Sequence, residues 1–214
     1  MVHSQISKEY LMKYVLCFVI LAAAFCSVMI DTKGNAASSI GFQFPTGAPK
    51  TGSGVWLHFG QSRPASKAYG HLGTDFKGLK GTKVYAAADG KVTQVTDGGQ
   101  TWRGIIIVEH DTRSWGWDKN VYSMYAHVVP KPGLKATDIV VRGQEIGTIA
   151  LKPTTSDIEH LHFEIRSGAS AWWNKGPAYC GWTFSASTID GATFGYSGIV
   201  WHNPYALITN NLFR

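Results

Sequence analysis

The stretch that decides the fold is His160-Leu161-His162-Phe163-Glu164-Ile165, in which polar and apolar side chains alternate strictly. Because successive side chains of a β-strand point to opposite faces, this pattern predicts a strand whose apolar side chains pack into a core. Both imidazoles then lie together on the other face. Such a pair suits one metal ligand beside one proton-transfer group, although a His-x-His pair alone also arises by chance on protein surfaces.

Other short strands are expected before this stretch. Residues 82–95 have the pattern of a hairpin with a tight turn at Asp89-Gly90, and residues 105–109 are a β-branched run typical of a central strand. Residues 140–141 and 146–151 predict a further strand pair. With 24 glycines, 13% aromatic and only 16% charged residues, the composition also favours many short strands and turns. The sequence therefore predicts an all-β fold.

Residues 123–129 form another alternating run. It predicts a strand with the following division of side chains: Met124, Ala126 and Val128 on one face, and Ser123, Tyr125 and His127 on the other.

The N-terminal residues 1–36 have the layout of a secretion signal. Lys8 and Lys13 precede an apolar run from Tyr14 to Ile30, and small residues follow. The run is slightly shorter than the roughly 18 to 20 apolar residues that cross a bilayer, but an uncleaved N-terminal anchor stays open as the alternative. Both interpretations predict export, to a secreted, periplasmic or cell-wall-associated location.

One catalytic domain is expected after the signal. Residues 37–54 predict an extended lead-in, residues 55–214 the domain, and residues 169–200 an aromatic insertion within it. Cys180 is the one cysteine outside the signal, which excludes a disulfide framework. Removal of residues 1–36 takes away three lysines and two acidic residues, so the net charge falls from +6 to +5. This charge suits an anionic polymer such as cell wall, and no nucleic-acid motif is present.

Further polar residues complete a candidate metal site. His71 and Asp75 lie in Gly70-His71-Leu72-Gly73-Thr74-Asp75, whose glycines permit a tight backbone path, and His127 ends the strand predicted at 123–129. A catalytic zinc has three N or O protein ligands and one open position. Two histidines and one carboxylate meet this need, and two histidines are left over. Bound zinc would lower the pKa of a water molecule, and a nearby imidazole could accept its proton.

With these motifs the sequence resembles the lysostaphin-type peptidoglycan zinc metallo-endopeptidases. The matching blocks, in the order of the family, are Gly70-His71-Leu72-Gly73-Thr74-Asp75, residues 81–92, Tyr125-Ala126-His127-Val128, Arg142-Gly143-Gln144-Glu145-Ile146-Gly147 and residues 160–166. The resemblance implies a small antiparallel β-sheet sandwich with a metallopeptidase groove. It also implies one zinc ion held by His71, Asp75 and His162, with His127 and His160 as catalytic residues. The substrates would be stem or cross-bridge peptides of peptidoglycan, with zinc-bound water as the nucleophile.

Two segments depart from the family pattern. Residues 152–159 replace a Gly-rich approach to the His-x-His strand, and the insertion at 169–200 is unusually long. Loops beside a cleft determine substrate choice. The insertion is expected to form a rim that orients the glycan or the stem peptide, with ordinary aromatic packing as the alternative.

The other ionisable residues have simpler interpretations. Glu164 is either a partner of a metal ligand or, as we favour, part of a solvated salt bridge with Arg166. His58, His110 and His202 are expected to be surface or hydrogen-bonded structural residues.

Two other functions stay open. A binding-only cell-wall module would use the same groove without turnover. A biotinyl or lipoyl carrier would need a lysine at the hairpin tip, where this chain has Asp89-Gly90. A monomer is expected, with membrane contact only through an uncleaved N-terminal segment.

Overall fold

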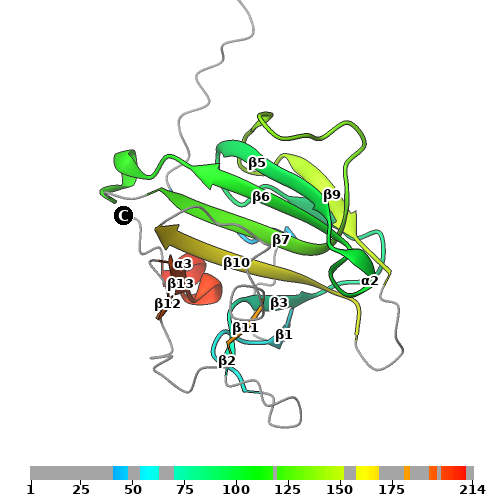
Figure 1. The fold of residues 1–214 in the computed structure, drawn as a ribbon, viewed down its shortest axis with the longest axis horizontal. Helices are drawn as coiled ribbons and strands as arrows, with labels where there is room; N and C mark the ends of the chain where they lie inside the picture. The colour runs from blue at the N-terminus through cyan, green and yellow to red at the C-terminus, as the bar shows by residue number, and fades with distance from the viewer. Residues whose placement is uncertain are drawn as a thin grey trace, which may run out of the picture. The chain divides into compact units, whose positions relative to one another are not determined.

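The computed structural model describes residues 41–47, 54–62, 70–117, 120–151, 158–168, 181–183, 193–196 and 199–210. These residues all belong to the second of two units into which the chain divides, Ser39–Arg214. Strands dominate this unit (Figure 1). All strand pairings among the described residues are antiparallel, so the predicted all-β antiparallel fold is confirmed.

The elements have the following bounds. The strands are β1 Val55–Leu57, β2 Gly70–His71, β3 Thr74–Lys77, β4 Lys83–Tyr85, β5 Gly90–Asp97, β6 Gly104–His110, β7 Val121–Pro130, β8 Ile139–Val140, β9 Glu145–Ile149, β10 His160–Gly168, β11 Trp182–Thr183, β12 Thr193–Tyr196 and β13 Ile199–His202. The helices are α2 Gly99–Trp102, the short 3-10 helix η3 Arg113–Trp115, and α3 Pro204–Asn210.

The main sheet has the strand order β1-β3-β10-β7-β6-β5-β8 and branches at β7. The first part of β7 pairs with β10, whereas its last part pairs with β9, which in turn pairs with β4. Side chains from both branches meet in the main hydrophobic core, including Phe163 of β10 and Ile149 of β9. The two branches therefore enclose the core in two layers, as expected for a sandwich.

Strand β10 lies at the centre of this arrangement. It pairs with β7 along one edge, and with β3 and then β13 along the other. Leu161, Phe163 and Ile165 all belong to the main core, as their alternation predicts. The intervening polar side chains, His160, His162, Glu164 and Arg166, lie on the opposite face of the sheet and are buried as well.

The face assignment along β7 is wrong after Ala126, because a bulge interrupts the alternation. Ala126 pairs with Ile105 and Val128 pairs with Gly104, so His127 is the extra residue between them. His127 has a φ of 62°, a backbone conformation that residues other than glycine seldom adopt. As a result Val128 joins Tyr125 in the main core, and the His127 side chain lies on the face that carries His160 and His162.

The predicted hairpin at residues 82–95 and the predicted strand pair at 140–151 are also wrong. β4 pairs with β9 and β5 pairs with β6 and β8, while β8 and β9 do not pair with each other. Three fully buried alanines separate β4 from β5, so the chain crosses the core here instead of turning back. Gly90 is needed for a close approach to the Glu109 backbone carbonyl, because a side chain at this position would overlap that oxygen. The prediction of a central strand at residues 105–109 is confirmed by β6, which lies between β5 and β7.

Part of the expected lead-in packs on the main core. Phe42 is buried, and its ring contacts the rings of His110 and Trp115 at centroid distances of 5.0 and 5.3 Å. The backbone N–H of Gln43 donates to the Ala87 carbonyl at 2.7 Å. Residues 41–47 therefore cover one side of the domain core.

His110 is the centre of a buried hydrogen-bond chain, in line with its expected structural role. Its Nδ1 lies 2.8 Å from the Asp89 carbonyl oxygen and its Nε2 lies 2.8 Å from Ser123 Oγ. Ser123 Oγ lies 3.0 Å from the Tyr125 hydroxyl, which accepts a hydrogen bond from the Ala87 backbone N–H. Burial disfavours the imidazolium form and lowers the pKa of His110 to about 4, against the weaker opposing effect of Asp89.

We expect His110 to make the fold sensitive to acid. Its pKa is lower in the folded chain than in the unfolded chain, so the unfolded state binds more protons between about pH 4 and pH 6.5. The contribution of neutral His110 to the free energy of unfolding is fully present above pH 6.5. It is lost as the pH falls towards 4, by about 3 kcal/mol in total. Urea unfolding at pH 7 and pH 4 measures this loss. His110→Gln should lose markedly less stability between the two pH values, and an equal loss in both proteins would contradict the prediction.

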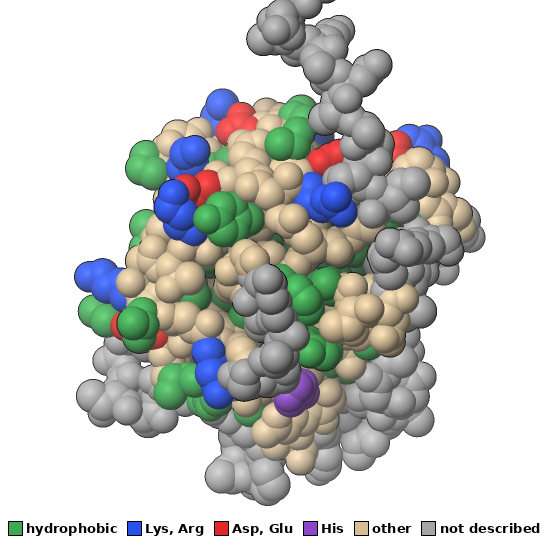
Figure 2. All heavy atoms as spheres, turned by 180° about the vertical axis from the view of Figure 1, so that it is seen from behind, with side chains coloured by type: hydrophobic (Ala, Val, Ile, Leu, Met, Phe, Trp, Pro, Cys, Tyr) green, Lys and Arg blue, Asp and Glu red, His purple; other side chains and the backbone are tan. Residues whose placement is uncertain are grey.

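Charged side chains are dispersed over one face of the domain. On the face in Figure 2, Lys and Arg side chains lie apart from one another and several adjoin Asp or Glu. Ion pairs of the domain join Lys83 to Glu145 at 2.9 Å and Lys135 to Asp138 at 2.8 Å. In the part of the chain that the structure describes, no helix combines the length and the apolar character required to span a membrane.

Candidate metal centre

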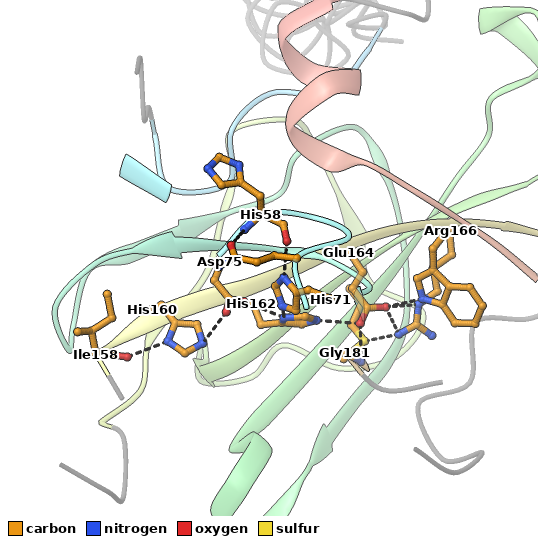
Figure 3. A network of polar contacts seen from close by, with 12 residues as sticks. His58, His71, Asp75, Ile158, His160, His162, Glu164, Arg166 and Gly181 are labelled. Atoms are coloured by element: carbon orange, nitrogen blue, oxygen red, sulfur yellow. Dashed lines mark hydrogen bonds and ion pairs between the residues drawn. The ribbon is translucent and has the colours of Figure 1, made fainter. Parts of the chain in front are cut away.

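Strands β2, β3 and β10 bring His71, Asp75 and His162 together. Asp75 of β3 is the direct cross-strand neighbour of His162. Asp75 Oδ1 lies 2.8 Å from His162 Nδ1 and 3.2 Å from His71 Nε2, and these two nitrogens are 3.0 Å apart (Figure 3). All three residues are buried, and their possible ligand atoms lie within 4.8 Å of one another. The structure thus assembles the three predicted donors at one point.

Gly73 explains how the His71 segment reaches β10. A Cβ atom at this position would lie 2.6 Å from the Phe163 carbonyl oxygen and 2.8 Å from His162 Cε1. These separations are too short for non-bonded atoms, so only glycine lets β3 approach β10 this closely. The glycine inside the His-x-x-x-Asp motif is therefore part of the site geometry.

The outer nitrogens of His71 and His162 face hydrogen-bond acceptors. His71 Nδ1 lies 3.2 Å from the His58 carbonyl oxygen, and His162 Nε2 lies 2.8 Å from Glu164 Oε1. An acceptor beside one imidazole nitrogen keeps the proton there and leaves the lone pair on the other nitrogen. The inner nitrogens of His71 and His162 thus converge with the Asp75 carboxylate, and this donor set fits a divalent cation such as zinc.

The two remaining predicted histidines adjoin the donors. His160 Nε2 lies 3.5 Å from Asp75 Oδ2, and His160 Nδ1 lies 2.8 Å from the Ile158 carbonyl oxygen. The His127 ring lies 4.7 Å from the His160 ring and 6.1 Å from the His162 ring, measured between centroids. Both rings are nearly inaccessible to solvent. All five predicted site residues therefore share one region of the fold.

The electrostatics of the site keep its carboxylates ionised. Burial alone would raise the pKa of Asp75, but His71 and His162 hold it well below its usual value. For Glu164, burial is likewise outweighed, by Arg166 and His162, and the pKa falls to about 2. For His162, burial is outweighed by Asp75 and Glu164, and the pKa rises to about 9. Two buried negative charges thus flank His162.

The interpretation of Glu164 as part of a solvated salt bridge is wrong. Glu164 and Arg166 are both completely buried, and the Arg166 Nε–H donates to Glu164 Oε2 at 2.6 Å. The reason is that Gly181 and Trp201, which follow β10 in the chain, lie against its polar face, and each donates a hydrogen bond to Glu164 at 2.9 Å. The simpler interpretations of the other histidines agree with the structure, since His58 is exposed and His202 Nε2 lies 2.7 Å from Ser167 Oγ.

Two tryptophans beside His127 and His160 were not singled out from the sequence. Trp102 of α2 stacks on His127 with a centroid distance of 5.3 Å and an interplanar angle of 10°. Trp56 of β1 packs against His160 at 4.6 Å. Neither tryptophan lies in a motif that distinguishes it from ordinary packing, so no sequence signal points to them.

Part of the aromatic insertion pairs with the strand that carries His71. β11 pairs with β2, placing Trp182 opposite His71, and the Leu72 backbone N–H donates to the Gly181 carbonyl at 2.8 Å. A side chain on Gly181 would overlap the Trp102 ring. Most of the insertion, including Trp172 and Cys180, lies outside the described residues, as do residues 152–157 and the Trp182 side chain.

Three solved structures are similar to this chain. A zinc-containing peptidase from Vibrio cholerae is 25% identical, over 60% of this chain and 37% of that chain, with a TM-score of 0.47. The catalytic domain of lysostaphin from Staphylococcus simulans is 23% identical over 53% and 79%, with a TM-score of 0.44. A variant of the catalytic domain of the prophage-encoded M23 protein EnpA from Enterococcus faecalis is 21% identical over 64% and 90%, with a TM-score of 0.43. The chain spans well under half the length of the Vibrio cholerae protein.

The sequence match is to peptidase family M23 and covers residues 69–173. This segment includes His71, Asp75, His127, His160 and His162. The resemblance to lysostaphin-type peptidases is thereby confirmed. Residues 69–173 of this chain are a peptidase family M23 domain.

Proposed function

We propose that the protein is a zinc-dependent endopeptidase that hydrolyses peptide bonds in bacterial peptidoglycan. The observation that carries this proposal is the buried His71, Asp75 and His162 donor set with two further histidines beside it. Three N or O ligands are the set typical of a zinc that keeps a position open for catalysis. One zinc ion per chain follows from this one site.

His160 and His127 have different surroundings, which favours different tasks. With its Nδ1 proton directed to the Ile158 carbonyl, His160 presents a basic Nε2 on the side of Asp75. We assign His160 as the proton acceptor and His127, held by Trp102, as the residue that stabilises the negative charge developing on the substrate oxygen. Zinc, when bound, would supply a water molecule of lowered pKa and polarise the scissile carbonyl.

Peptidoglycan as the substrate rests on the family and on the charge of the chain. Lysostaphin, one of the similar proteins, is described as an antimicrobial peptidase. The net charge of +6 would help the protein accumulate on an anionic wall. Export through residues 1–36, by a cleaved signal or as an anchored protein, would bring the enzyme to this substrate.

A binding-only wall module is the second candidate. It would need neither three converging donors nor two further histidines beside them, and the presence of both in this chain supports the endopeptidase. The two functions differ in whether wall peptides are cleaved.

We expect the zinc-loaded full chain to release soluble fragments with new amino groups from purified peptidoglycan. Removal of zinc with a chelator should abolish the release, because hydrolysis needs the polarised carbonyl and the activated water. Re-addition of zinc should restore it, and magnesium should not. Mass spectrometry of the fragments identifies the bond that is cut. Sedimentation with the wall without any release would favour the binding module, and an unchanged rate after verified zinc removal would exclude zinc catalysis.

A further inference from the structure

Glu164 accepts four hydrogen bonds from three parts of the chain (Figure 3). Its Oε1 faces His162 Nε2 at 2.8 Å and the Gly181 backbone N–H at 2.9 Å. Its Oε2 faces Arg166 Nε at 2.6 Å and Trp201 Nε1 at 2.9 Å. This carboxylate is fully buried, and both of its oxygens are fully used.

The position of this carboxylate matters for the metal donors. A carboxylate at the outer nitrogen of a histidine ligand fixes the ring orientation, holds the proton on that nitrogen and strengthens the inner nitrogen as a donor. His162 is the donor that shares its inner nitrogen contacts with both His71 and Asp75. A shift of Glu164 would therefore turn the His162 ring away from the other two donors.

Two of the hydrogen-bond donors to Glu164 lie outside β10 and outside the segment that matches the family. Gly181 belongs to the aromatic insertion and Trp201 belongs to β13, whereas the matched segment is 69–173. Trp201 is fully buried, packs in a small core with Leu72, and lies over the Arg166 guanidinium at 5.5 Å from the ring centroid. Two segments of the C-terminal part of this chain thus meet at the carboxylate beside His162.

We propose that Glu164 is a positioning residue for the metal ligand His162, and that the Trp201 indole N–H and the Gly181 backbone N–H hold it in place. Gly181 and Trp201 are then structural parts of the metal centre as well as neighbours of it. This inference rests on the proposed metal site, but it concerns metal affinity and ligand geometry instead of the identity of the substrate.

The experiment measures the metal site of the full chain directly. Zinc affinity is measured by competition with a chromophoric chelator, and the geometry of the site by the visible absorption spectrum after loading with Co²⁺. Glu164→Gln keeps the shape of the side chain but removes its charge, and should lower the zinc affinity about 10- to 100-fold and alter the cobalt spectrum. Trp201→Phe removes one donor to Glu164 and should cause a smaller loss in the same direction.

Two controls separate positioning from general stability. Trp117→Phe replaces an indole that packs against the main core and contacts the His202 ring at 5.1 Å between centroids, whereas Glu164 lies on the opposite face of β10. This variant should leave zinc affinity and the cobalt spectrum as in the parent. In the Glu164→Gln background, Trp201→Phe should have almost no further effect on zinc affinity, because the two residues act through one contact. All values are compared well below the melting temperature of each variant.

The results distinguish this inference from the proposed function. The inference would be overturned if the folded Glu164→Gln variant bound zinc as tightly as the parent. It would also be overturned if the two substitutions lowered the zinc affinity additively in the Glu164→Gln/Trp201→Phe double variant. If Glu164→Gln does not fold, parent-like affinity and spectrum in Trp201→Phe would overturn it. A parent protein that binds zinc tightly but cleaves no wall peptide would overturn only the proposed function. A parent that binds no zinc would overturn both.

Discussion

Alanine variants of His71, Asp75 and His162 should lose bound zinc and wall hydrolysis together. Each residue supplies one of three converging donor atoms, so its removal leaves two. The loss of zinc affinity should exceed about 10²-fold, since even the outer partner of a ligand contributes 10- to 100-fold. Atomic spectroscopy of the purified variants measures the zinc content, and release from peptidoglycan measures turnover.

Alanine variants of His127 and His160 are the matched comparison, because both rings lie in the same buried region. They should keep roughly one zinc per chain while turnover falls by about 10² to 10⁴-fold, the scale of a lost general acid or base. If His160→Ala loses zinc and His162→Ala keeps it, the ligand assignment within β10 is reversed. If all five folded variants hydrolyse wall like the parent, the proposed active site is wrong.

Gly73→Ala should cause the loss of zinc although it changes none of the three proposed ligand residues. The added methyl group would lie 2.6 Å from the Phe163 carbonyl oxygen and 2.8 Å from His162 Cε1, so β3 and β10 must separate. Since Asp75 and His162 are cross-strand neighbours, this separation pulls the two donors apart. We expect at least about a 10²-fold loss of zinc affinity, comparable to the loss of a whole ligand and above that of an outer partner.

Gly81→Ala is the control for the cost of a new side chain on a glycine. Gly81 has a φ of 85°, but a Cβ atom there would meet no other atom within 4 Å. This variant should lose about 1–2 kcal/mol of stability from backbone strain and keep its zinc. Equal zinc affinities in the two variants would show that the close approach at Gly73 does not determine the metal geometry.

The chemistry of the site could be predicted from the sequence because it depends on local patterns. Strict alternation in residues 160–165 assigns side chains to two faces whatever the neighbouring strands are, and the structure places Leu161 and Phe163 in the core and His162 opposite. The types of donor atom at His71, Asp75 and His162 are likewise a property of the residues themselves. The motifs of the family then indicated which histidines belong to one site.

Strand pairing could not be predicted in the same way, because several apolar strands compete as partners. β4 and β5 follow one another and have a turn-like Asp89-Gly90 between them, yet they pair with β9 and with β6 and β8. Burial of three alanines in the core decides this path, and burial is a property of the whole fold. Gly90, which indicated a turn, instead allows a close approach to the Glu109 backbone carbonyl.

What the sequence by itself determined is the set of candidate donor residues and the alternation of polar and apolar side chains along β10. Only the tertiary structure decided where His127 points and what surrounds Glu164. The bulge at His127 lies in the pairing of β7 with β6, at the residue where the other edge of β7 changes its partner from β10 to β9. The alternation within a single strand does not reveal such a change of partner. Glu164 is buried because Gly181 and Trp201, which follow 17 and 37 residues later, close over it, and contacts of such separation arise only when the chain is folded.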